Sequence, residues 1–150
     1  KGIINGCAGQ EKDRQETWIN NKIITLYSQL FEQGFVQTVE CWQDDVLVGG
    51  LYGISLKGAF FGESMFSHKS NASKIALIHL IARLNEDGFT LLDTQFTTDH
   101  LISIGAIEIA RSDYIDQLNR ALLINTKFNT NGSNLSHQIH IEKLLYKELQ

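Results

Sequence analysis

The sequence predicts a single α/β domain built on a mixed β-sheet that is flanked by helices. Three observations support this fold class: a meander of three short strands near the middle of the chain, an apolar helix directly after it, and a further apolar strand after that helix. At 150 residues and 43% hydrophobic, the chain can bury a core without the help of metals or disulfides.

Charge and cysteine content argue against several classes of function. The net charge is −4 and the pI is about 5.7, so overall charge does not attract the chain to nucleic acid or anionic membranes. Binding to nucleic acid would then need a local basic patch. Cys7 and Cys41 lack the spacing of a metal site. We interpret them as small buried residues in a reducing compartment, and expect a cytoplasmic protein without metal or cofactor. No apolar run approaches the roughly 20 residues of a membrane span.

The first part of the chain predicts a short strand, a polar loop and a helix. Ile3 to Ala8 is apolar enough for a strand, and residues 9–16 are polar. A helix is expected from Asn20 to Gln33 because its apolar residues recur at helical spacing, and Gly34 supplies a stop. These apolar residues are Ile23, Ile24, Tyr27, Leu30 and Phe31.

Three strands should follow as a meander, at Val36 to Trp42, Val46 to Ile54 and Ala59 to Met65. The segments between them, 43–45 and 57–58, have the residue types of hairpin turns. The middle strand contains the run 49–53, which is rich in glycine. Glycine inside a strand marks a bulge or a close approach by another backbone or a ligand, or it only relieves crowding under an aromatic neighbour such as Phe60 or Phe61.

The second half predicts a helix from Asn71 to Asp87, ended by Gly88, and a strand from Thr90 to Phe96. Shorter elements should follow: a helix at 98–104, an extended piece at 107–109 and a helix at 113–123. A polar loop is expected at 125–136, and 138–149 is either helical or extended. We therefore divide the chain into a domain of residues 1–124 and a variable tail, residues 125–150, packed on it or extending it. This order of elements matches the acetyltransferase (GNAT-type) fold, which is an analogy of fold alone.

Two acidic residues lie in unusually apolar surroundings. Asp93 and Gln95 are two residues apart on the predicted strand, so their side chains should leave the same face roughly 7 Å apart. Asp93 has a structural alternative, namely capping the next loop through the amides of residues 97–99. Glu63 is surrounded by aromatic and apolar residues, so it either has a polar partner or faces a cavity.

The start of the helix near residue 71 is a candidate anion site. Asn71, Ser73 and Lys74 offer backbone amides and a cation to a phosphate, although many helices begin this way with nothing bound. The glycine-rich pyrophosphate loop of acetyl-CoA enzymes is missing. Trp18, Tyr27 and Trp42 are candidates for stacking on a base, though isolated aromatics more often belong to a core.

Several segments together resemble the leucyl/phenylalanyl-tRNA–protein transferase family over about Ile3 to Leu118. The likeness is carried, in order, by Val39-Glu40-Cys41-Trp42, Leu47-Val48-Gly49-Gly50-Leu51-Tyr52-Gly53, Phe61-Gly62-Glu63-Ser64-Met65-Phe66-Ser67, Asn71-Ala72-Ser73-Lys74-Ile75-Ala76-Leu77, Leu92-Asp93-Thr94-Gln95 and His100-Leu101-Ile102-Ser103-Ile104-Gly105-Ala106. Each segment alone is weak, whereas the combination is specific.

The resemblance implies an acetyltransferase-like domain that uses aminoacyl-tRNA in place of acetyl-CoA, which accounts for the missing glycine loop. It implies transfer of Leu or Phe, and less well Met, from tRNA to the N-terminal Arg or Lys of an acceptor protein, which is thereby marked for degradation in the bacterial cytoplasm. The expected partners are therefore Leu-tRNA or Phe-tRNA and acceptor proteins, with the enzyme acting as a monomer. Family members carry a further N-terminal segment, which helps to hold the tRNA and is not in the printed sequence.

The resemblance also assigns roles to individual residues. Asp93 and Gln95 would be the catalytic pair, and Glu63 would make polar contacts in the site. Trp18 and Tyr27 would flank the terminal adenosine. The pocket for the Leu or Phe side chain would be lined by Leu51, Phe60, Met65, Leu77, Leu80 and Leu92.

One geometric prediction follows from these roles. Phe60 and Glu63 are an odd number of residues apart and would face opposite sides of a regular strand, so a bulge or twist is expected near Gly62. Two other functions fit the sequence: an N-acyltransferase that uses acyl-CoA, and a catalytically silent domain of the same fold.

Overall fold

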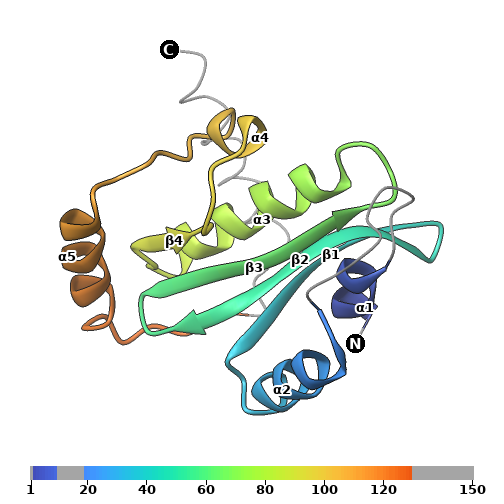
Figure 1. Ribbon diagram of the computed structural model, residues 1–150, viewed down its shortest axis with the longest axis horizontal. Helices are drawn as coiled ribbons and strands as arrows, with labels where there is room; N and C mark the ends of the chain where they lie inside the picture. Colours follow the sequence, from blue (N-terminus) through green and yellow to red (C-terminus); the bar gives the residue numbers. More distant parts are fainter. Residues whose placement is uncertain (1, 10–18, 130–150) are drawn as a thin grey trace.

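The computed structural model describes residues 2–9 and 19–129, and Figure 1 shows how their elements are arranged. The predictions for Trp18, for most of the loop at 9–16 and for the tail from residue 130 lie outside these residues. The elements are α1 (Gly2–Ala8), α2 (Asn21–Glu32), β1 (Val36–Gln43), β2 (Val46–Leu56), β3 (Ala59–Ser67), α3 (Ala72–Glu86), β4 (Leu91–Asp93), α4 (Asp99–Ile102) and α5 (Arg111–Ala121).

The four strands form one mixed sheet in the order β1-β2-β3-β4. The predicted meander is confirmed: β1, β2 and β3 are antiparallel neighbours, and β4 pairs parallel to β3. Asp44 and Asp45 adopt φ values of 50° and 59°, and Lys57 adopts 56°. Two successive positive φ values suit the two-residue turn that joins β1 to β2, because their twist matches that of the strands.

Helices cover both faces of the sheet. In Figure 1, α3 lies on one side, and α1 and α2 lie on the other. Buried residues accordingly form one cluster between the sheet and α3, which includes Leu51, Phe60 and Leu80, and a second cluster under α1 and α2, which includes Ile3 and Tyr52. The α/β class with a mixed sheet is therefore confirmed.

Residues Ile3 to Ala8 form part of α1, so the prediction of a strand here is wrong. Ile3 and Ile4 are buried, and Cys7 and Ala8 pack against the same cluster. Positions 3, 4, 7 and 8 have the spacing of one helical face, which the short β-branched run concealed. The helix buries this face against β2 and β3.

The strand predicted at 90–96 is shorter than expected, and β4 ends at Asp93. Gln95 adopts φ 65°, and its backbone amide donates to Asp93 Oδ1 at 2.8 Å. This local turn, closed by the side chain of Asp93, diverts the chain from the sheet. The predicted geometry of two side chains leaving one face of a regular strand is therefore wrong. The helix predicted at 98–104 is confirmed only as the single turn α4, and residues 107–109 take no regular secondary structure.

Residues 122–129 fold back on the domain. Phe128 is buried, with its ring centroid 6.0 Å from Phe60 and 6.4 Å from Phe89. The Asn129 amide donates to Asp87 Oδ2 at 2.8 Å. The beginning of the predicted tail thus contributes to the core. No helix in the described ranges is long and apolar enough to cross a membrane.

Candidate functional site

A bulge in β3 places Glu63 at the point where two strands separate. Ser64 pairs with Tyr52, and Gly62 pairs with Gly53, so Glu63 is the extra residue of β3. The bulge predicted near Gly62 is therefore confirmed. Next to it, the last pair between β3 and β4 joins Phe61 to Asp93, after which β3 pairs only with β2 as far as Ser67. A bulge re-aims side chains locally, and Glu63 is directed into the opening.

A cavity of about 240 Å³ lies at this opening. It extends from the bulge towards α3 and α4, and its walls include the pocket residues Leu51, Met65, Leu77, Leu80 and Leu92. Glu63 lines it as well. Phe60 is not among its lining residues: it is fully buried in the core and packs on Phe128. The structure thus brings six of the predicted site residues to one cavity.

The polar residues next to this cavity are joined by hydrogen bonds. Gln95 Nε2 donates to Glu63 Oε2 at 3.3 Å, so the carboxylate of Glu63 has a polar partner among its apolar neighbours. Asp93 Oδ1 accepts from the Gln95 amide, and Asp93 Oδ2 accepts from the Tyr114 hydroxyl at 2.7 Å. The alternative role of Asp93 as a cap for the amides of residues 97–99 is wrong, since its two oxygens accept from the Gln95 amide and the Tyr114 hydroxyl. Asp93, Gln95 and Glu63 therefore form one connected group, although they belong to different segments.

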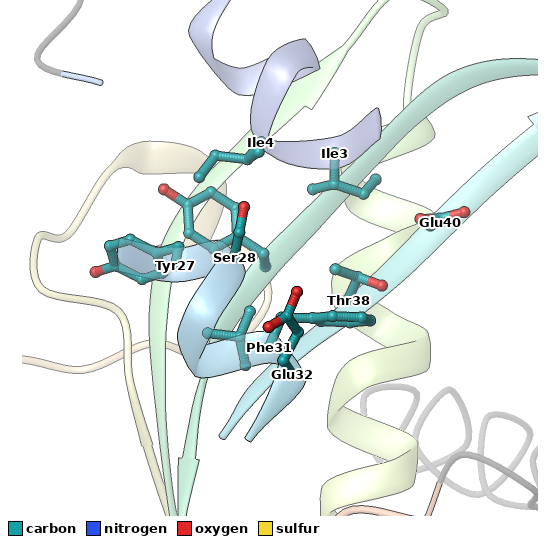
Figure 2. Close-up of a pocket in the computed structure, with 10 residues that line it drawn as sticks. Ile3, Ile4, Tyr27, Ser28, Phe31, Glu32, Thr38 and Glu40 are labelled. Atoms are coloured by element: carbon teal, nitrogen blue, oxygen red, sulfur yellow. The ribbon is translucent and has the colours of Figure 1, made fainter. Parts of the chain in front are cut away.

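Tyr27 approaches Glu63 from the other side of the sheet. Burial first, and then the nearby Glu63 carboxylate, raise the pKa of the Tyr27 hydroxyl. Its ring meets Tyr52 edge-on, with centroids 5.3 Å apart. Tyr27 also lines a cavity of about 300 Å³ between the helices α1 and α2 and the strand β1, where Figure 2 shows it with Ile4 and Ser28.

Tyr52 separates these two cavities. It is 2% exposed, it lines both, and its hydroxyl has no hydrogen-bond partner among the described residues. Burial is the main cause that raises the pKa of Tyr52, so it stays protonated at neutral pH and can donate a hydrogen bond.

The start of α3 is less open to an anion than the sequence suggested. Asn71 adopts φ 65°, and its side chain caps no amide of α3. Instead, Ser67 Oγ accepts from the Ser73 amide at 3.3 Å, and the Ala72 amide donates to a backbone carbonyl. Two amides of the first turn are thus already in use, while Lys74 remains exposed.

Sequence reasoning missed two residues of this region. His100 lines the 240 Å³ cavity, and its ring nitrogens are both buried without a partner among the described residues. Burial first, and then the nearby charge of Lys74, lower the pKa of His100, so the ring is neutral at pH 7. Tyr114 comes from α5, and no local pattern connects it with Asp93, which is far away in the sequence. The polarity of His100, next to the apolar Leu101, could have drawn attention to it.

This arrangement has the parts needed for transfer of an acyl group to an amine. The cavity offers an apolar surface for a side chain, and next to it lie two carboxylates and an amide that can orient and deprotonate a nucleophile. Among the described residues, no group of three or more His, Cys, Asp or Glu side chains is placed to hold a metal ion.

Comparison with known proteins agrees with this chemistry. The model of the leucyl/phenylalanyl-tRNA protein transferase family matches residues 1–119. Proteins named leucyl/phenylalanyl-tRNA–protein transferase are similar to the chain: that of Maricaulis maris is 57% identical over 128 residues, and that of Phenylobacterium zucineum 55% over 131. These alignments cover 85% and 87% of this chain, but only 59% of either relative, so the chain spans less than two thirds of their length. The chain belongs to the leucyl/phenylalanyl-tRNA protein transferase family.

Proposed function

We propose that this chain forms the catalytic part of an aminoacyltransferase. It would move Leu or Phe, and less well Met, from aminoacyl-tRNA to the N-terminal Arg or Lys of an acceptor protein. The observation that carries this proposal is the group of Glu63, Asp93 and Gln95, which is joined by hydrogen bonds next to an apolar cavity where β3 and β4 separate. The names and the identity of the relatives support it.

The cavity of about 240 Å³ would receive the side chain of the transferred amino acid. The apolar side chains that line it are unbranched or γ-branched: Leu51, Met65, Leu77, Leu80 and Leu92. Phe60 would support them from the core behind. Such a surface suits Leu or Phe and disfavours β-branched Ile or Val by shape, because a misplaced methyl group costs about 1–3 kcal/mol. Tyr27, and Trp18 outside the described residues, would flank the terminal adenosine.

Asp93 and Gln95 would prepare the acceptor amine. The neutral α-amine attacks the ester carbonyl, a C–N bond forms, the C–O bond to the ribose breaks, and the ribose hydroxyl leaves with a proton. Gln95 is fixed through both its backbone amide and its side-chain nitrogen, so its Oε1 is available to orient the amine. The carboxylate of Asp93 accepts two hydrogen bonds and retains lone pairs with which it can help to remove the amine proton. No covalent enzyme intermediate is needed.

Several wider features belong to the same proposal. The fold would be acetyltransferase-like, with aminoacyl-adenosine in place of acetyl-CoA between the separating strands. Residues 1–124 would form the catalytic domain, with the start of the tail, through Phe128 and Asn129, packed on it. A tRNA phosphate would bind at the start of α3, near Asn71, Ser73 and Lys74. Lys74 would make the main contact, since the first backbone amides of α3 already have partners within the protein. The enzyme would act as a monomer in the cytoplasm.

The test is transfer of labelled Leu from Leu-tRNA to a peptide that begins with Arg. It should be run for the 150-residue chain and for a longer form that carries the N-terminal segment of a relative. We expect transfer by the longer form at least. Failure of both forms, together with thermal stabilisation by acetyl-CoA but not by the aminoacyl-adenosine analogue puromycin, would replace the proposal with an acyl-CoA enzyme.

A further inference from the structure

A second cavity lies on the outer side of β4, away from β3. Its volume is about 440 Å³, and it is lined by residues 91–97, residues 107–109 and Tyr114. It shares Leu92, Thr94 and Phe96 with the 240 Å³ cavity, and it contains Asp93 and Gln95. The segment that carries the proposed catalytic pair therefore separates the two cavities. If the aminoacyl group occupies the inner cavity, the outer one is free for the acceptor.

The outer cavity presents one carboxylate that the protein itself uses only in part. Glu108 Oε1 accepts from the Thr97 hydroxyl, and Oε2 has no hydrogen-bond partner among the described residues. The oxygens of Asp93, in contrast, are both engaged, by the Gln95 amide and the Tyr114 hydroxyl. Thr97 thus orients Glu108 and leaves one of its oxygens for a ligand.

Two large apolar side chains on the wall of the outer cavity are exposed. Phe96 is 77% exposed and Ile107 is 78% exposed, although both are large apolar residues. Long cationic side chains bury an apolar stem along such surfaces and keep the charged head at an acidic group, and an aromatic face adds attraction to the cation. The combination of these two exposed apolar side chains with an oriented carboxylate therefore fits a Lys or Arg side chain.

Glu108 and Gln95 line the same outer cavity and are linked through Thr97. Thr97, which holds Glu108, is two residues from Gln95, so the backbone between them spans at most about 7 Å. A Lys or Arg side chain is of comparable length, with its charge at the end of a flexible stem. An α-amine held at Gln95 would thus leave the charge of the same residue near Glu108.

We propose that Glu108, oriented by Thr97, binds the cationic side chain of the acceptor's first residue in the outer cavity. This subsite rests on the proposed function, and it would set the preference for N-terminal Arg or Lys. Glu108 would act on the choice of acceptor and not on the donor, since it does not line the inner cavity.

The experiment compares Glu108→Gln with wild type on two peptides that differ only in their first residue, Arg or its neutral isostere citrulline. Wild type should use the Arg peptide at least tenfold better in kcat/KM. Glu108→Gln should lose at least tenfold on the Arg peptide, mainly through KM, and should use the citrulline peptide as before. Thr97→Val should have a kcat/KM on the Arg peptide between those of wild type and Glu108→Gln. Asp116→Asn, which removes one negative charge from α5 outside the cavity, should behave as wild type.

Binding of the same fluorescently labelled peptides, measured by anisotropy without tRNA, separates the subsite from the function. Weaker binding of the Arg peptide to Glu108→Gln, with no transfer by any form, would support the subsite and defeat the proposed function. Transfer by Glu108→Gln with an unchanged preference for Arg over citrulline would overturn the subsite and leave the function standing. Equal losses on both peptides would also overturn it, because they indicate a structural role.

Discussion

At the scale of single residues, the site depends on the side chains that contact the carboxylates of Asp93 and Glu63. Tyr114 donates to Asp93, and burial together with this carboxylate raises the pKa of Tyr114 to about 12, so the phenol remains a donor at every physiological pH. Burial first, and then the Glu63 carboxylate, likewise raise the pKa of Tyr27, which approaches from the other side of the sheet. Each of the two carboxylates thus has a protonated phenol beside it.

His100 should make stability depend on pH. Its folded-state pKa is lowered, whereas the unfolded chain protonates near the ordinary value of about 6.5, so the unfolded state binds more protons below that pH. Stability is therefore complete above about pH 6.5 and falls as the pH decreases towards the folded-state pKa.

The check is the urea midpoint at pH 7 and at pH 5. The midpoint of wild type should decrease more than that of His100→Gln, which removes the titrating group. Identical decreases for the two proteins would show that His100 does not carry this dependence.

Sequence reasoning reached the acidic residues but not their partners. Glu63 and Asp93 were identifiable because a carboxylate in an apolar run requires an explanation. Tyr114 and Tyr27 were beyond the reach of sequence patterns as partners, because hydrogen bonds between distant segments depend on how helices pack on the sheet.

At the scale of elements, close packing in the meander depends on glycine. A Cβ on Gly49 would lie 2.5 Å from the Ala72 Cβ, so the start of α3 can approach β2 only because this side chain is missing. At Gly53 a Cβ would overlap the Phe60 ring and the Phe61 carbonyl. Both interpretations of the glycine run therefore apply: a close approach at Gly49, and relief of crowding by an aromatic ring at Gly53.

Gly53→Ala should destabilise the protein by about 1–3 kcal/mol, the usual cost of forcing a methyl group into a packed core. Gly62→Ala is the matched control in the paired strand, since its Cβ would come no closer than 3.4 Å to the Asp93 carbonyl. The free energy of unfolding in urea gives the answer. Equal stability of the two variants would contradict the packing described here.

The elements that the sequence predicted well were long or clearly punctuated. The helix α2 and the three strands of the meander agree with their predicted bounds to within about two residues. The errors fell on short segments: α1 has too few residues for its period to be read safely, and β4 ends early because the Asp93 side chain captures a nearby amide.

At the scale of the whole molecule, the two helical layers leave the separation of β3 and β4 open and place a cavity on each side of β4. The core behind the inner cavity is completed by the segment after α5. Phe128 contacts Phe60 and Phe89, and the Arg83 guanidinium lies 5.8 Å from its ring centroid.

Phe128→Ala should therefore cost about 3–5 kcal/mol of stability, as is typical of a buried Phe replaced by Ala. Lys127→Ala, at the exposed neighbouring position, should cost little. Chemical denaturation measures both. A small loss for Phe128→Ala would mean that residues from 125 onward are an appendage and not part of the domain.

The α/β class could be predicted from the order of elements, because a meander followed by a helix and a strand leaves few arrangements. The contribution of Phe128 could not, because one aromatic residue in a polar segment carries no period. The cavities could not be predicted either. They arise where β3 and β4 separate beside the bulge, and the sequence predicted the bulge near Gly62 but not the cavities that result from it.

The role of Asp93 as a proton acceptor is tested by the rate of Leu transfer from Leu-tRNA to an Arg peptide, measured for wild type and for Asp93→Asn in the form of the protein that is active. Asp93→Asn should transfer Leu at least about tenfold more slowly with an unchanged unfolding midpoint, and Asp116→Asn should transfer it at the wild-type rate. Transfer at the wild-type rate by folded Asp93→Asn would show that Asp93 has no such role.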